Sequence, residues 1–282
     1  MKAFTDYLLK KGYSSKTANS YANTANHFSA WAEEENIILE ATTNRDVLHY
    51  IQIRKKTASQ RTIGFIVNGL KHYFDHLSIK EMFQSNQPNP ASQIKIQGIK
   101  RKKLYHILTK QELEQLYENY PNTTPTNKRN KAILSLMIWQ GLNASELFNL
   151  EAKDLKLREG KIYIAGGRKS NERELKLESV QILDLMEYQL QHRQSEKLFT
   201  SSGASNNGHN VMYKFMKGLK KQNPKVDSAK QIRTSVITHW LKTYNLREVQ
   251  YMAGHRYVSS TEAYLVNDLE SLSEDIEKYH PF

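Results

Sequence analysis

Apolar residues recur at helical spacing along most of this chain, and that periodicity constrains the fold more than any other feature. After Ser14-Ser15, a cap signal, apolar side chains such as Tyr21, Ala25 and Phe28 follow each other at intervals of three or four. This spacing puts them on one face of an α-helix. We expect further helices over 44–54, 59–76, 109–120, 128–140, 144–150, 179–192, 210–222, 228–244, 247–252 and 265–282. Thr109-x-x-Glu112 is a capping box that opens the helix at 109.

Two short segments depart from the helical pattern. Residues 161–164 (KIYI) and 172–177 (ERELKL) alternate between apolar and polar positions, and the loop AGGRKSN joins them. Alternation with period two and a glycine-containing loop predict a β-hairpin. The chain is therefore expected to be mainly α-helical, with one small antiparallel sheet in its second half.

A proline-containing, basic segment divides the chain. Residues 84–103 hold two prolines and five Lys or Arg with no acidic residue. This composition predicts a helical domain over 1–83, a basic linker over 84–104 and a second domain over 105–282. The linker is either a solvated tether or a strap against a phosphate backbone, and we favour the strap. The candidate DNA-binding residues are Lys95, Lys100, Arg101, Lys102, Lys103 and Arg61.

Charge and composition limit the class of protein. The formal net charge is +12 and the isoelectric point about 9.5, which indicates a polyanionic partner. The chain has no cysteine, so disulfides and thiolate-bound metals are excluded. No apolar run is long enough to span a membrane, and the N-terminus lacks a signal core. We expect a cytoplasmic protein without metal or cofactor.

The stretch AGHRYVSSTEAYL (253–265) carries the candidate chemistry. Gly254 is expected to end a helix, His255 follows it, and Ser259-Ser260-Thr261 is a helix-start signal that would place Tyr264 inside the next helix. In a basic protein this pair suggests phosphate chemistry, with the phenol as nucleophile and the imidazole as proton carrier or oxygen-binding donor. The alternative is a surface tyrosine and a histidine that bonds the last helix carbonyls.

The order of these segments resembles the tyrosine recombinase (phage integrase) family over nearly the whole chain. The N-terminal part, with KGYSSKTANSYANTANHFSAW and RTIGFIVNGLKHYF, is similar to the family's core-binding domain. The remainder is similar to its catalytic domain. The resemblance implies a C-shaped, two-domain DNA clamp, in which a helical SAM-like domain joins an α+β integrase-type catalytic domain.

The resemblance assigns roles to several residues. Tyr264 matches the nucleophile that becomes joined to a 3′ phosphate and releases a 5′ hydroxyl, and His255 matches a position that supports the phosphate. Arg233 matches the arginine of the family's H-x-x-R box, where a guanidinium can hold two phosphate oxygens. Lys230 stands in place of the histidine of that box. No metal is implied.

Two positions depart from the family pattern. Alignment of the hairpin loop puts Arg168 at the catalytic lysine, with Lys169 one residue on; arginine is a poor general acid, so Lys169 is our choice. Asn143 stands where the family's GLR-x-SEL turn carries an activating arginine. Asparagine is a good helix N-cap, and Asn143-x-x-Glu146 matches a capping box, so the fold should not suffer, whereas catalysis could. Arg168, Arg129 and Lys131 are possible replacements.

Three functions remain open at this point. The first is a metal-free recombinase of a mobile element, acting on double-stranded DNA with inverted repeats as a homo-tetramer, monomeric or dimeric when free, and possibly with a partner recombinase. The second is a DNA-binding protein of the same fold, accessory or competitor, whose chemistry is lost. The third is a helical RNA-binding protein, for which the usual sheet motifs are not seen. The last predicted helix would dock on a neighbouring protomer or on its own core.

Overall fold

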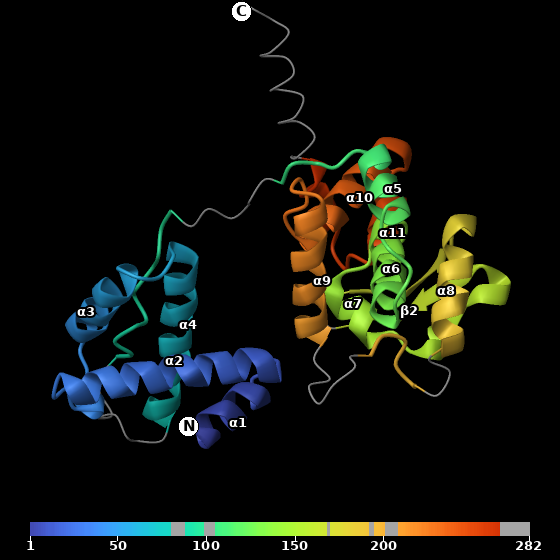
Figure 1. The fold of residues 1–282 in the computed structure, drawn as a ribbon. Helices are drawn as coiled ribbons and strands as arrows, with labels where there is room; N and C mark the ends of the chain where they lie inside the picture. The colour runs from blue at the N-terminus through green and yellow to red at the C-terminus, as the bar shows by residue number, and fades with distance from the viewer. Residues whose placement is uncertain (80–87, 99–104, 168–169, 192–194, 201–207, 266–282) are drawn as a thin grey trace, which may run out of the picture. The chain divides into compact units, whose positions relative to one another are not determined.

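The computed structural model describes residues 1–79, 88–98, 105–167, 170–191, 195–200 and 208–265, in two compact units. The units comprise Met1–Lys103 and Leu104–Phe282 (Figure 1). Each encloses its own hydrophobic core. Within the described ranges, every helix is too short or too polar to cross a membrane. The chain is mainly helical, as its periodicity predicts.

The described part of the N-terminal unit holds four α-helices. Helix α2 packs against α1 and α4, and α3 packs against α4 (Figure 1). The predicted cap of α2 is confirmed, because the Ser14 side chain accepts a hydrogen bond from the Thr17 amide. Phe28 and Phe74 are fully buried between the helices. The helices are α1 (Lys2–Lys10), α2 (Ser15–Glu34), α3 (Asn44–Lys55) and α4 (Gln60–Ile79), with a 3₁₀ turn at Leu39–Ala41.

Residues 88–98, which the sequence assigns to the linker, pack on the N-terminal unit. Ala91 and Ile94 are buried in its core. The Asn89 side chain donates to the Lys71 carbonyl and to the Asp75 carboxylate, at 2.8 and 2.7 Å. This part of the segment is therefore not a free tether but belongs to the N-terminal unit. The prolines and polar residues of this segment are typical of a linker. Its two buried apolar side chains nevertheless anchor it to the core.

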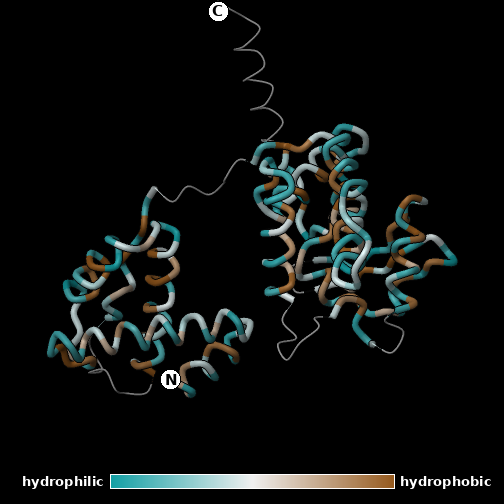
Figure 2. The backbone as a smooth tube through the Cα atoms, in the orientation of Figure 1, coloured by the Kyte–Doolittle hydropathy of each residue, from teal (hydrophilic) through white to brown (hydrophobic). Residues whose placement is uncertain are grey.

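The C-terminal unit is built around α6, which packs against α5, α8 and α10 (Figure 1). Ile133 and Leu136 on α6 are fully buried, and Figure 2 shows hydrophobic and hydrophilic residues alternating along the helices of this unit. The predicted capping box of Thr109 and Glu112 opens α5. The helices are α5 (Lys110–Glu118), α6 (Pro125–Ile138), α7 (Ala144–Asn149), α8 (Ser179–Gln191), α9 (Gly208–Gln222), α10 (Ala229–Thr243), α11 (Leu246–Ala253) and α12 (Val258–Glu262), with 3₁₀ turns at Ala152–Asp154 and Leu157–Glu159.

The described part of this unit contains a three-stranded antiparallel sheet of order β1-β2-β3. The predicted hairpin is confirmed as β2 (Lys161–Ile164) and β3 (Arg173–Lys176), in which Ile164 pairs with Arg173. Strand β1 (Leu155–Lys156) was not predicted, because two residues are too few to show alternation.

The structure corrects the prediction around Tyr264. Helix α12 begins at Val258, so Ser259-Ser260-Thr261 lies inside the helix and does not cap it. The helix ends at Glu262, so Tyr264 follows it in a turn instead of lying one or two turns inside. A helix-start signal has no fixed distance to the first helical residue. Here the helix starts at Val258, one residue before the signal. Residues 266–282 of the last predicted helix lie outside the described ranges.

Candidate active site

Arg233 projects from α10, and its guanidinium is held on several sides. Nη1 donates to the Gly141 carbonyl and lies 3.4 Å from Glu146 Oε2, while Nη2 donates to the Ala253 carbonyl at 2.7 Å. The residue is only 8% exposed. Burial lowers the pKa of Arg233, although the charges of Glu146 and Tyr264 oppose that change. A guanidinium remains charged in proteins, so this is a fixed, oriented positive group.

Glu146 is held by the turn that carries Asn143. The Asn143 side chain accepts hydrogen bonds from the amides of Ser145 and Glu146, at 2.9 and 3.0 Å, and its own amide donates to Glu146 Oε2 at 3.0 Å. The predicted capping box is therefore confirmed. Asn143 stabilises the start of α7 and at the same time fixes the carboxylate that contacts Arg233.

A second guanidinium, that of Arg173 on β3, reaches the other oxygen of Glu146. Its Nη1 lies 2.8 Å from Glu146 Oε1, and its Nε donates to the Met252 carbonyl at 2.8 Å. The side chain is fully buried. Sequence reasoning missed Arg173. Its inward position in an alternating strand was the available signal, since a charged residue there needs a buried partner.

His255 follows the C-cap of α11, where Gly254 adopts the predicted left-handed conformation at φ 65°. Its Nδ1 lies 2.9 Å from Thr261 Oγ1, and its Nε2 lies 3.5 Å from Arg233 Nη2. Burial, followed by the positive charges of Arg233 and Arg173, lowers the pKa of His255 to about 4. The imidazole is therefore neutral at pH 7. Thr261, which orients the ring, was read from the sequence only as part of a cap.

Tyr264 meets His255 and Arg233. Its ring stacks on the imidazole with centroids 5.6 Å apart and an interplanar angle of 16°. A hydrogen bond with the Tyr264 hydroxyl is among the interactions that support the charged form of Arg233 and so raise its pKa. The ring packs beside Ile237 and Val249 and is partly exposed. A phenol, a neutral imidazole and a guanidinium thus converge.

The hairpin loop ends beside this cluster. Ser170 forms an isolated antiparallel β-bridge with His255, and the Asn171 amide donates to the Gly254 carbonyl at 3.0 Å. Arg168 and Lys169 themselves lie outside the described residues. Lys230, one turn before Arg233 on α10, is exposed, with its amino group 5.7 Å from the centre of the Tyr105 ring.

Two of the suggested replacements for an arginine at 143 have other partners. Arg129 donates to the Thr200 carbonyl and to the Asn130 side chain. Lys131 forms an ion pair with Asp184 at 3.2 Å. Among the described residues, neither of them contacts Glu146 or Arg233, and the basic residue seen at Glu146 beside Arg233 is Arg173.

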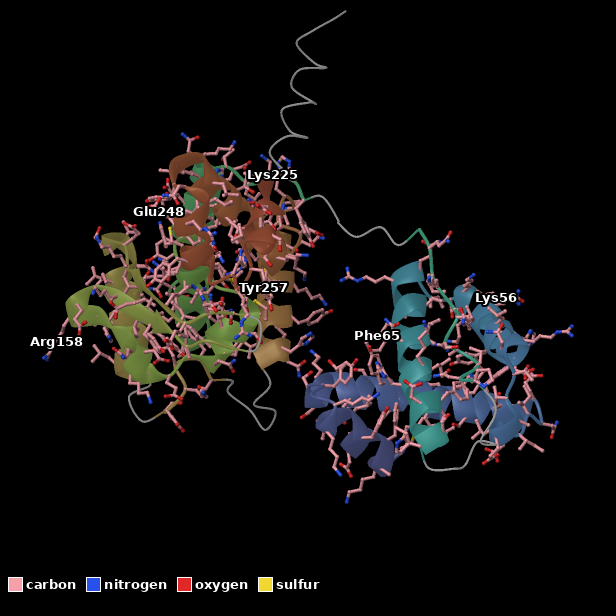
Figure 3. The ribbon with its side chains drawn as sticks, turned by 180° about the vertical axis from the view of Figure 1, so that it is seen from behind. Lys56, Phe65, Arg158, Lys225, Glu248 and Tyr257 are labelled. Carbon is pink, nitrogen blue, oxygen red and sulfur yellow. The ribbon has the colours of Figure 1, made fainter. Side chains whose placement is uncertain are left out.

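The candidate DNA-binding residues lie outside this cluster. Arg61, on α4, and Lys95, in the packed segment 88–98, are both exposed on the N-terminal unit. Phe65, which Figure 3 labels, lies one turn after Arg61 on α4, and 38% of its surface is exposed. Lys100, Arg101, Lys102 and Lys103 lie outside the described residues.

With the fold and this cluster in view, comparison with known proteins identifies the family. Residues 106–270 match the Phage integrase family, and residues 1–82 match the Phage integrase, N-terminal SAM-like domain. The chain belongs to the phage integrase family. The resemblance stated from the sequence is thereby confirmed, together with its integrase fold and SAM-like N-terminal domain.

Relatives within the family match along nearly their whole length. Tyrosine recombinase XerA of Pyrococcus furiosus is 26% identical over 285 residues, which cover 99% of this chain and 93% of the relative. Tyrosine recombinase XerD of Oceanobacillus iheyensis is 27% identical, with coverage of 97% and 95%. The XerH site-specific recombinase, in a post-cleavage complex with palindromic difH substrate, shares the fold with a TM-score of 0.74 at 19% identity, over 93% of this chain and 79% of that one.

Proposed function

We propose that this family member is a site-specific DNA recombinase that cleaves and rejoins strands through a 3′-phosphotyrosine at Tyr264. The observation that carries the proposal is the convergence of the Tyr264 ring, the His255 imidazole and the Arg233 guanidinium. These groups come from α10 and from the turns after α11 and α12, and each is held by further contacts. A nucleophile beside a fixed positive charge suits attack on a phosphodiester.

The chemistry follows from these positions. The Tyr264 oxygen attacks phosphorus, the bond from phosphorus to the 5′ oxygen breaks, and the strand end leaves as a 5′ hydroxyl. Arg233 stabilises the charge that builds on the non-bridging oxygens. The phenolic proton leaves to solvent, and the neutral His255, whose ring is oriented by Thr261, donates a hydrogen bond to a phosphate oxygen. Attack by another 5′ hydroxyl reverses the step without an external energy source.

Lys169 is proposed as the acid that protonates the leaving 5′ oxygen. Ser170 and Asn171, which follow Lys169 in the sequence, contact His255 and Gly254. Arg168 would bind phosphate as a fixed charge, because its pKa is too high for proton transfer. Lys230 would add a positive group on the first turn of α10.

The proposed partner is double-stranded DNA with an inverted-repeat recombination site. The net charge of +12 favours a polyanion, and the relative XerH is described as bound to a palindromic substrate. A palindromic site fits two protomers related by a two-fold axis, and pairing of two sites gives the proposed homo-tetramer. Integration or excision of a mobile element is the proposed role, and a partner recombinase could supply half of the protomers.

A nicked suicide duplex that carries the cognate site tests the proposal. The wild-type chain is expected to form a covalent protein–DNA band that Tyr264→Phe abolishes. Tyr257→Phe is the matched control, because Tyr257 is a neighbouring phenol that is 68% exposed (Figure 3), and its loss should leave the band unchanged. A band that persists in Tyr264→Phe would refute the assignment.

One observation favours a second candidate, a recombinase-fold DNA-binding protein with impaired chemistry. The Asn143 side chain is engaged in capping α7, so position 143 offers no charge to a phosphate. This candidate predicts specific binding of the duplex without a covalent band. The same experiment therefore separates the two functions.

A further inference from the structure

Glu146 creates a charge problem at the phosphate site. Its buried carboxylate lies 3.4 Å from Arg233 Nη1 and would by itself neutralise that guanidinium. Asn143, at the position where family members carry an arginine, adds no positive charge. With these three side chains alone the cluster would have a net charge of zero, and a phosphate would gain little from approaching it.

Arg173 changes this balance. It binds the opposite oxygen of Glu146 at 2.8 Å, so two guanidiniums share one carboxylate and the buried cluster carries one net positive charge. In a water-excluded site a net charge acts more strongly than it would in solvent. The net positive charge of the cluster therefore attracts the anionic group that contacts Arg233.

We propose that Arg173 is a positioning residue that replaces the charge missing at Asn143: it binds Glu146 and so leaves the charge of Arg233 available to the scissile phosphate. The inference rests on the proposed function. Arg173 does not itself touch the DNA, because its side chain is fully buried. It acts through Glu146, whose second oxygen contacts Arg233.

Two further features concern the space and the hydrogen bonding around the Arg173 guanidinium. Gly254 leaves the space that it fills, since a Cβ at 254 would overlap the Arg173 guanidinium. In the described part of the chain, Arg173 Nη2 is buried without a hydrogen-bond partner. Leaving such a donor unsatisfied costs stability, so an arginine that served only to cross-link the fold would be an expensive choice.

The first test measures how fast the covalent complex forms on the suicide duplex. Arg173→Gln should slow it about 100-fold, the loss typical of one fixed donor in an active site. Adding Glu146→Gln removes the carboxylate that then holds Arg233, so the double variant should regain about tenfold or more of this loss. Arg173→Lys keeps the charge and should lie between wild type and Arg173→Gln. If the double variant is no faster than Arg173→Gln, Arg173 is only structural and the proposal is wrong.

The second test needs no catalysis. NMR titration of the His255 ring in the full-length chain reports the local field, which is set by Arg233 on α10, Arg173 on β3, Glu146 on α7 and Tyr264 after α12. Arg173→Gln should raise the pKa of His255, and the double variant should return it toward the wild-type value. An unchanged pKa in folded Arg173→Gln would overturn the proposal.

The two tests fail independently. If the wild-type chain forms no covalent complex, the proposed recombinase activity fails, while the His255 titration still decides whether Arg173 offsets Glu146. Circular dichroism confirms that each variant is folded. If Arg173→Gln alone unfolds, the double variant is compared with Glu146→Gln instead. With the carboxylate gone, loss of Arg173 should slow covalent complex formation by less than about tenfold, and a loss of about 100-fold would contradict the proposal.

Discussion

At Glu146, one carboxylate accepts hydrogen bonds from two guanidiniums and from the amide of Asn143. Burial would raise the pKa of Glu146, but the hydrogen bond and charge of Arg173, with the charge of Arg233, bring it below its ordinary value. The carboxylate is therefore ionised at neutral pH. Removing one partner of such a buried group leaves an uncompensated charge, so substitutions here act on the site as a unit.

Asn143→Arg adds the charge that the resemblance to the family leads us to expect at this position. We expect it to speed covalent complex formation by about 10²-fold, the effect of one added donor at a developing charge. The cap of α7 is lost, which costs about 1 kcal/mol of stability. Asn143→Ala is the matched control, because it loses the same cap without adding charge. Equal rates for the two variants would show that position 143 does not act on the phosphate.

His255 makes the stability of the folded chain depend on pH. Its pKa falls from 6.5 to about 4 on folding, so the unfolded chain binds more protons between these values. The stabilising contribution is complete above pH 6.5 and is lost as the pH falls toward 4. Urea unfolding at pH 7 and pH 4.5 should show a smaller acid loss in His255→Asn than in the wild-type chain. An equal loss in both would indicate that the imidazole is not buried in its neutral form.

At the scale of elements, the junction between α11 and α12 determines the site. Gly254 ends α11, His255 and Tyr264 flank the five residues of α12, and the hairpin loop attaches through Asn171. The C-cap therefore orients the imidazole and leaves room for Arg173 at the same time. A substitution at Gly254 would therefore disturb both the end of α11 and the position of the Arg173 charge.

Gly254→Ala should damage this junction more than a left-handed glycine elsewhere. Gly160 has nearly the same φ, 62° against 65°, but open space where a Cβ would lie. Gly160→Ala should lose only the conformational term, about 1–2 kcal/mol. Gly254→Ala should lose more, because the added methyl group displaces Arg173, and it should also slow covalent complex formation. Similar unfolding free energies for both variants would contradict the close packing.

The elements were predictable where the signal is local. Residues close together in the sequence determine the helical periodicity, the caps at Ser14 and Thr109 and the alternation of the hairpin. The structure confirms these features. The packing of residues 88–98 and the pairing of Arg173 with Glu146 depend on segments distant in sequence, so local patterns could not reveal them. The end of α12 before Tyr264 was missed because a five-residue helix has too few turns to show a period.

At the scale of the whole molecule, the chain has two separate hydrophobic cores and a net charge of +12. Both features suit binding to a long polyanion. The C-terminal unit holds the cluster of Tyr264, His255 and Arg233, while Arg61 and Lys95 are exposed on the N-terminal unit. The predicted C-shaped clamp concerns the placement of the two units around DNA and remains a prediction. Binding that uses both units should depend strongly on salt.

Duplex affinity should fall by about 10³-fold or more between about 50 and about 200 mM salt. Arg61→Gln and Lys95→Gln should each reduce the slope of log affinity against log salt by about 0.9, the value for one lost phosphate contact. Lys153→Gln is the control, since Lys153 is paired with Glu151 at 2.7 Å on the other unit. Unchanged slopes for both Arg61→Gln and Lys95→Gln would remove these residues from the interface.

The central claim is that Tyr264 itself becomes joined to DNA, and peptide mass spectrometry of the trapped complex tests it most directly. After nuclease digestion, the peptide that contains Tyr264 should carry a nucleotide linked through its 3′ phosphate, and the released strand should end in a 5′ hydroxyl. A nucleotide found on Tyr257 or on another residue, or a strand released with a 5′ phosphate, would contradict the account.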